Sequence, residues 1–316
     1  MVNACESNIC DVCAAVANCI DDKCACPPGS AGTGIKCSRS NMMIPISKSP
    51  ELSPGRALCT DPYWIKIAEL QSVSIIVGQH ALDPTWKPCL ELVTGSGVTV
   101  YATLNAHKES LMGWKQTMKD RIDEIVTEYG SSIGGIYFTN ASKDLGFTNS
   151  KYSDVLSHAK SANLAIGVDG TESLFDMSTV TDVDHVVLFN GLVTEFLSNC
   201  GSFGQGPFCS GHEYISDTFI QSLADEISNG NIQSDKFSSM VFATSFLNLV
   251  QVVDVHFGGA FPGGLFVSDQ SSTDLTTMPS YFEMFANLIT AKAEGADKVG
   301  EIFIKFLFFR KSFIFF

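Results

Sequence analysis

Polar side chains that could take part in chemistry directly follow several short apolar runs of the sequence. The residues in these positions are Thr139, Asn140, Asp169, Asn190 and Asp269. A carboxylate can exchange a proton near neutral pH, whereas threonine and asparagine side chains only donate and accept hydrogen bonds. Because α/β proteins keep their functional residues at the carboxyl ends of strands, this edge is the candidate site.

Asp169 and Asp269 are the pair that we expect to carry any acid–base chemistry, because each directly follows an apolar run. Asp83 and Glu195 also fall where the rim of such a site would lie. Each of these carboxylates is equally consistent with an ordinary loop or helix N-cap position, where acidic side chains are stabilising.

Eight short apolar runs predict the elements that would position these residues. They cover residues 42–46, 73–78, 98–104, 134–138, 164–168, 185–189, 239–244 and 264–268. Continuous rather than alternating apolar runs are typical of strands buried on both faces, as in a parallel sheet. Helix-like segments lie between them, for example residues 112–130, 152–163 and 214–230.

This alternation over residues 41–293 predicts an α/β fold, a (β/α)8 TIM-type barrel. An open doubly wound sheet is the alternative. It is disfavoured because no G-x-G-x-x-G motif follows the first strand.

The amino-acid composition limits the functional classes to which the protein can belong. Hydrophobic residues make up 45% of the 316 residues and charged residues 17%, so a large core is expected. The formal charge of −14 disfavours nucleic acid and anionic lipid as partners, because both would repel the protein. We expect no transmembrane segment, no cofactor and no metal.

The cysteines predict a small N-terminal module at residues 1–38. Seven of the eleven fall between Cys5 and Cys37, a density typical of disulfide-stapled domains. Zinc is the alternative, but no histidine lies near the cluster. Disulfides imply an extracellular or cell-surface location. No secretory signal opens the chain, so we expect the sequence to be incomplete at its N-terminus.

The stretch CAAVANCIDDKCACPPGSAGTGIKC (13–37) resembles an EGF-like domain, through its C-x-C, its Pro-Pro-Gly turn and the glycines before the last cysteine. The resemblance implies the pairs Cys13–Cys24 and Cys26–Cys37, and for Cys19 a bond with either Cys5 or Cys10. Calcium is not supported, because no acidic-Asn signature precedes the module.

Two further cysteine pairs and the C-terminal tail complete the domain organisation. We interpret Cys59 with Cys89, and Cys200 with Cys209, as structural disulfides. Residues 294–316 form an aromatic and basic tail, in which residues 301–316 are too short and too charged to span a bilayer. We expect this tail to be non-native, with a membrane-surface helix as the alternative.

Several stretches in order along residues 41–293 resemble the spherulation-specific family, the spherulin-type glycoside hydrolases that cleave galactosamine-containing polysaccharides. They are MMIPISKSPE, VSIIVGQHALDP, GGIYFTNAS, DHVVLFNG and GGLFVSDQSSTDLTTMPSYFEMF. The resemblance implies a (β/α)8 barrel. It also implies glycoside hydrolysis, which needs an acid and a second carboxyl group.

The sequence departs from the family where the chemistry would lie. The family's Asp-Glu pair falls on Thr139 and Asn140, and the glutamate of its Phe-Glu falls on Asn190. None of these side chains can serve as a general acid. Asn140 also begins an N-glycosylation sequon, Asn-Ala-Ser, so it is either a glycan anchor or a ligand contact.

If the site binds sugar, flat rings that stack on apolar sugar faces and polar side chains at the rim should hold it. The candidate ligand-binding residues are His80, Asp83, Trp86, Asn105 and Tyr281. Trp86, in a loop after Asp83-Pro84, is the best stacking candidate. Trp64 belongs in the core.

Three functions follow from the sequence. The first is a secreted or cell-surface polysaccharide-binding protein with a catalytically impaired glycoside-hydrolase-like barrel, associated with cell wall or extracellular matrix. The second is an active glycosidase whose carboxylates have moved to Asp169 and Asp269. The third is a structural or adhesion module.

Overall fold

The structure is a computed structural model of the 316-residue chain, and part of the chain is described. The described residues are 18–20, 23–25, 31–32, 37–38, 42–46, 49–53, 58–70, 73–77, 83–106, 114–139, 150–169, 182–201, 222, 225–226, 229, 231–232, 236–257, 264–270 and 279–293. Most of the expected helix at 214–230, the sequon at Asn140, His80 and the tail at 294–316 lie outside these residues.

The cysteine-rich segment contains two short antiparallel pairs. β1 (Asn18–Ile20) pairs with β2 (Lys23–Ala25), and β3 (Ala31–Gly32) pairs with β4 (Cys37–Ser38). Cys5, Cys10, Cys13 and Cys26 lie outside the described residues, so the EGF-like module and its cysteine pairing stay predictions.

All eight predicted apolar runs form strands, and together they make one parallel sheet. The strands are β5 (Met42–Ile46), β6 (Val73–Val77), β7 (Thr99–Asn105), β8 (Gly135–Thr139), β9 (Ala165–Asp169), β10 (His185–Leu192), β11 (Phe237–Phe242) and β12 (Leu265–Val267). Each strand pairs with its neighbour in sequence, in the order β5 to β12. The doubly wound alternative is wrong, because that fold changes strand order in mid-sheet.

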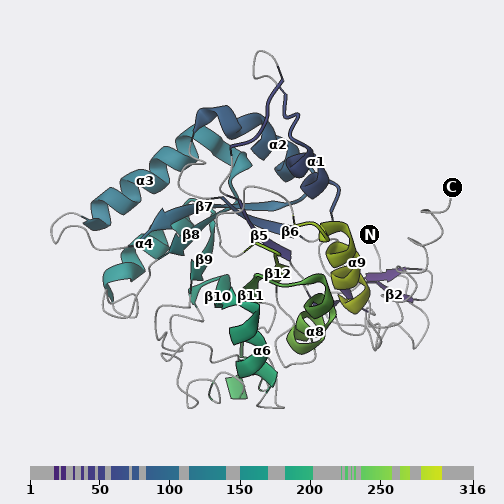
Figure 1. Ribbon diagram of the computed structural model, residues 1–316. Coiled ribbons are helices and arrows are strands. Elements are labelled where there is room, and N and C mark those ends of the chain that lie inside the picture. The colour runs from purple at the N-terminus through teal and green to yellow at the C-terminus, as the bar shows by residue number, and fades with distance from the viewer. Residues whose placement is uncertain are drawn as a thin grey trace.

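Helices connect the strands and lie around the outside of the sheet (Figure 1). They are α1 (Pro62–Ala68), α2 (Lys87–Gly95), α3 (Trp114–Tyr129), α4 (Ser150–Ser161), α6 (Val193–Gly201), α8 (Phe246–Phe257) and α9 (Phe282–Ala293). None of the helices in the described residues is long and apolar enough to cross a membrane.

The sheet curls toward closure. Its two edge strands, β12 and β5, are in contact with each other. In the part of the chain that the structure describes, no ladder of hydrogen bonds joins this pair. The fold is therefore an α/β half-barrel of parallel strands.

The two faces of the sheet bury different side chains. Phe189 of β10 packs on Phe196 of α6, with ring centroids 5.1 Å apart, so this face meets the helices. Tyr101 of β7 lies on the other, inner face, where its ring faces that of His185 at 6.4 Å. The inner face therefore carries aromatic and polar groups, and the helix-covered face carries apolar ones.

Glycines make room for the inner tyrosines. A Cβ at Gly135 would lie 2.6 Å from the ring of Tyr101, and a Cβ at Gly167 would lie 2.8 Å from Cδ2 of Tyr137. No side chain can occupy such space without moving the rings. Gly135 and Gly167 therefore let two large rings lie across β8 and β9.

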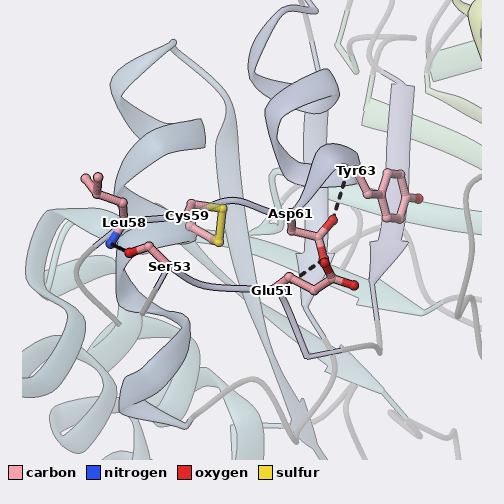
Figure 2. Close-up of a disulfide and its surroundings, with 7 residues drawn as sticks. Glu51, Ser53, Leu58, Cys59, Asp61 and Tyr63 are labelled. Atoms are coloured by element: carbon pink, nitrogen blue, oxygen red, sulfur yellow. Dashed lines mark hydrogen bonds between the residues drawn. A yellow bond between two sulfur atoms is a disulfide. The ribbon is translucent and has the colours of Figure 1, made fainter. Parts of the chain in front are cut away.

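A disulfide fastens the segment between β5 and α1 to helix α2 (Figure 2). Cys59 is bonded to Cys89 of α2, as the sequence analysis expects. Leu52 and Cys59 form an antiparallel bridge, and the Leu58 N–H donates to Ser53 Oγ at 3.1 Å.

Asp61 ties the same segment to the start of α1. Its carboxylate accepts the Tyr63 N–H at 2.8 Å and the Glu51 N–H at 3.0 Å. The first bond caps the helix, and the second holds the returning chain beside it. The segment, α1 and α2 thus form one braced unit.

We predict that replacing Cys59 and Cys89 together by serine lowers the free energy of unfolding by about 3–4 kcal/mol. The bond closes a loop of 30 residues. Closing a loop of that length lowers the entropy of the unfolded chain, which accounts for a free-energy difference of this size. Denaturant unfolding measures the difference. Wild-type protein treated with a reductant should unfold like the double variant, and an unchanged midpoint would contradict the prediction.

Candidate functional site at the carboxyl ends of the strands

Three neighbouring strands end in polar side chains at the same edge of the sheet. Asn105 ends β7 and is paired in register with Thr139, which ends β8. Asp169 ends β9, one residue after Val168, which is paired with Phe138. The parallel register therefore brings an amide, a hydroxyl and a carboxylate into one row.

These three side chains lie on the inner face. Asn105 lies four residues after Tyr101 in β7. Thr139 lies two residues after Tyr137 in β8, and Asp169 lies two residues after Gly167 in β9. Successive side chains of a strand alternate between faces, so residues two apart share a face. Thr139 and Asp169 are half-buried and Asn105 is exposed, as expected at the open end of a curled sheet.

A bulge in β10 brings Asn190 to the same face. The register of β10 against β11 shifts between Val187 and Phe189. Phe189 then meets the helices, as its contact with Phe196 shows, and Asn190 takes the opposite, inner side. Without the bulge, Phe189 would share the face of His185 and Asn190 would point to the helices.

Asp169 stands above a buried tyrosine. Burial, and then the negative charge of Asp169, raise the pKa of Tyr137 well above its ordinary value. The phenol therefore stays protonated at any physiological pH. Burial is the larger of the two causes, because it disfavours the charged form of the phenol.

A buried polar pair lies deeper on the inner face. Burial lowers the pKa of His185 to about 3, so the imidazole is neutral near pH 7. Its Nε2 is hydrogen-bonded to the Ser238 hydroxyl of β11. This pair belongs to the amino-terminal half of the sheet, and it ties β10 to β11 below the candidate site.

Asp269 does not join the row. It follows β12, three strands from β9, which is about 14 Å along the sheet at the usual strand spacing. Its Oδ2 accepts the Ser280 N–H at 3.2 Å, just before α9. Asp269 thus holds the chain that enters α9, and its pairing with Asp169 stays a prediction.

Tyr281 is buried beside that segment. Its hydroxyl donates to the Thr244 carbonyl at 3.0 Å, and burial together with the charge of Asp269 raises its pKa. This arrangement joins α9 to the end of β11. Tyr281 is thus a packing residue in this structure, where the sequence suggested a ligand contact.

Trp86 and Asp83 also have structural roles. Trp86 is 1% exposed and packs edge-on against Trp64, with ring centroids 5.8 Å apart. The expectation that Trp86 stacks on sugar is therefore wrong for this structure, because its faces are covered. Asp83 Oδ1 accepts the Thr85 N–H at 2.9 Å, which is the N-cap interaction that the sequence left open.

Glu195 is another carboxylate at this edge. The sequence analysis places it at the rim but does not choose it for acid–base chemistry. Its Oε2 accepts the Leu192 N–H at 3.3 Å, and a Cβ on Gly191 would lie 2.9 Å from the same oxygen. Glu195 therefore lies against the end of β10, immediately after Asn190. The sequence signal that could have selected Glu195 is its position in the first turn of the helix after β10, α6.

A cavity in the described part of the chain opens at the opposite edge of the sheet. Its volume is about 680 Å³, and it lies before β7, β8, β9 and β10. The residues that line it include Thr99, Gly134, Lys160, Asn163 and Asp184. Functional residues of such folds gather at the carboxyl ends, so this cavity does not mark the candidate site.

Comparisons with known proteins find no match to a family model and none among curated proteins. Solved structures do resemble the chain. An endo-beta-N-acetylglucosaminidase from Cordyceps militaris has 13% identity and a TM-score of 0.44, over 82% of this chain and 91% of that chain. The Nostoc punctiforme debranching enzyme has 8% identity and a TM-score of 0.45, over 80% and 79%.

A dihydrodipicolinate synthase from Bacillus clausii is similar as well, with 8% identity and a TM-score of 0.41, over 82% of this chain and 78% of that chain. Glycosidases are thus among the similar structures, beside a synthase. With TM-scores below 0.5, these likenesses carry no argument about activity. The resemblance to the spherulation-specific family stays a prediction.

We predict that His185 makes the protein less stable as the pH falls from 6.5 toward 3. In that window the unfolded chain binds a proton on this residue and the folded protein does not, so protonation favours unfolding. One such group contributes at most about 1.4 kcal/mol per pH unit.

Urea unfolding of wild type and His185→Gln at several pH values measures this effect. The variant should lose less stability than wild type over the window. Parallel losses in the two proteins would contradict the prediction.

Proposed function

We propose that the eight strands form a closed (β/α)8 barrel whose mouth binds a polysaccharide and has lost most hydrolase activity. The observation that carries the proposal is the row at the carboxyl edge: Asn105, Thr139 and Asp169 end three neighbouring strands, and Asn190 lies two residues before the end of the fourth. Amides, hydroxyls and a carboxylate together match the donors and acceptors of sugar hydroxyl groups.

The proposed loss of activity follows from the small number of carboxylates in the row. Glycoside hydrolysis uses an acid and a second carboxyl group about 5–10 Å away. Among the four residues of the row, Asp169 alone can exchange a proton near neutral pH. Thr139 and Asn190 stand where the spherulation-specific family has carboxylates, and Asn140 is the third such position.

The finer features of the proposal rest on the sequence. The resemblance favours a galactosamine-containing polysaccharide as the ligand. The density of cysteines before Cys37 favours an EGF-like module on a secreted or cell-surface protein, associated with cell wall or extracellular matrix. His80, and Asn140 if it carries no glycan, are further candidate contacts.

We predict that the purified protein binds galactosamine-containing oligosaccharides and releases few or no reducing ends from the corresponding polymers. A glycan array measures the binding, and a reducing-end assay measures the hydrolysis. Robust turnover would show that the acids are present. Failure to bind any glycan would favour the structural or adhesion module instead.

Active hydrolysis is a second candidate function, because Glu195 lies against the end of β10 beside Asn190. Asp169 would then act with Glu195, or with Asp269 as the sequence suggests. If hydrolysis is detected, Asp169→Asn should lower it by a factor of at least about 100, since general acid–base catalysis contributes that much.

Asp182→Asn is the matched control, because Asp182 is an exposed carboxylate near the amino end of β10. The control should retain full activity. A fully active Asp169→Asn variant would remove Asp169 from any catalytic role.

A further inference from the structure

One aromatic side chain is exposed in the described part of the chain. Phe246 is 37% exposed, whereas the other aromatic side chains whose burial is described are all buried. It is the first residue of α8 and follows the carboxyl end of β11 by four residues. The ring therefore lies on the rim of the same edge that carries the polar row.

The turn that presents Phe246 is unusual and firmly held. Ala243 has φ 54°, in the left-handed region that a residue with a Cβ seldom adopts. The Ala243 N–H donates to the Gln270 carbonyl at 2.6 Å, and the Thr244 N–H donates to the Ser268 carbonyl at 2.9 Å. Backbone in so unfavourable a conformation persists where surrounding bonds enforce it, and such places cluster at functional sites.

Phe246 has apolar neighbours on the same part of the rim. Leu247 is 81% exposed, and Leu192, which is paired in register with Phe242, is 39% exposed. The helices that these residues begin or precede, α6 and α8, are in contact with each other. Exposed apolar side chains therefore precede α6 and begin α8, at the same edge of the sheet as the polar row, and Leu192 lies two residues after Asn190.

The remaining exposed large apolar side chains of the described residues lie elsewhere. Leu58 belongs to the disulfide-held segment, Ile65 to α1 and Leu92 to α2. No polar row of strand ends adjoins them. They serve as controls for the effect of exposure alone.

We propose that Phe246 is the stacking platform of the polysaccharide site, the role that the sequence assigned to Trp86. This inference rests on the proposed function. A sugar ring has one face of C–H groups and an edge of hydroxyls. Phe246, with the exposed side chains of Leu192 and Leu247 on the same rim, receives the C–H face, and Asn190 with the rest of the row receives the hydroxyls.

The test is the affinity of the full chain for an oligosaccharide of four or more galactosamine and N-acetylgalactosamine units, measured by calorimetry. Phe246→Ala should bind at least fivefold more weakly than wild type, because the stacking surface is gone. Phe246→Trp should bind as tightly as wild type or more tightly. Leu92→Ala, at a side chain exposed to a similar degree (38%), should leave the affinity unchanged.

Thermal unfolding of each variant establishes that it is folded. If wild type binds and Phe246→Ala binds equally well, this inference is overturned and the proposed function stands. If Phe246→Trp does not bind at least as tightly as wild type, a stacking role for Phe246 is likewise overturned. If folded wild type binds no such oligosaccharide, the proposed function fails, and the platform fails with it.

Discussion

The continuous parallel ladder from β5 to β12 is the constraint on which the site depends. Side-chain facing in a strand has a period of two, so a slip of one residue would turn every inner group to the helices. The register of β7 with β8 and of β8 with β9 brings Asn105, Thr139 and Asp169 to one edge. A single bulge in β10 then adds Asn190 to the same face. The position of these polar side chains is thus a consequence of backbone pairing.

The inner face below the mouth gives this row a rigid floor. Tyr101 and Tyr137 lie across Gly135 and Gly167, and any larger residue at either glycine would collide with a ring. His185 and Ser238 join β10 to β11 in the same layer. Because these groups are buried and matched in shape, the floor has little freedom to rearrange. On the proposed function, ligand specificity therefore comes from the strand ends and the rim.

The sequence predicted the sheet well and the site only in part. Continuous apolar runs mark strands buried on both faces, so all eight strands were found. The strand ends at Thr139, Asp169 and Asn190 follow from the same runs. Trp86 was wrong because a tryptophan after a turn resembles a rim residue until its packing on Trp64 is known. Phe246 was missed because the exposure of one phenylalanine among 23 depends on tertiary packing, which no local pattern predicts.

The central claim is that a sugar lies at the carboxyl ends of β7 to β10 and is held there by hydrogen bonds. A crystal structure of the protein soaked with a galactosamine oligosaccharide tests it most directly. The account predicts an intact sugar with hydroxyl groups within hydrogen-bond distance of Asn105, Thr139, Asp169 or Asn190. A sugar seated only in the cavity at the amino ends of these strands would contradict it, as would a mouth left empty.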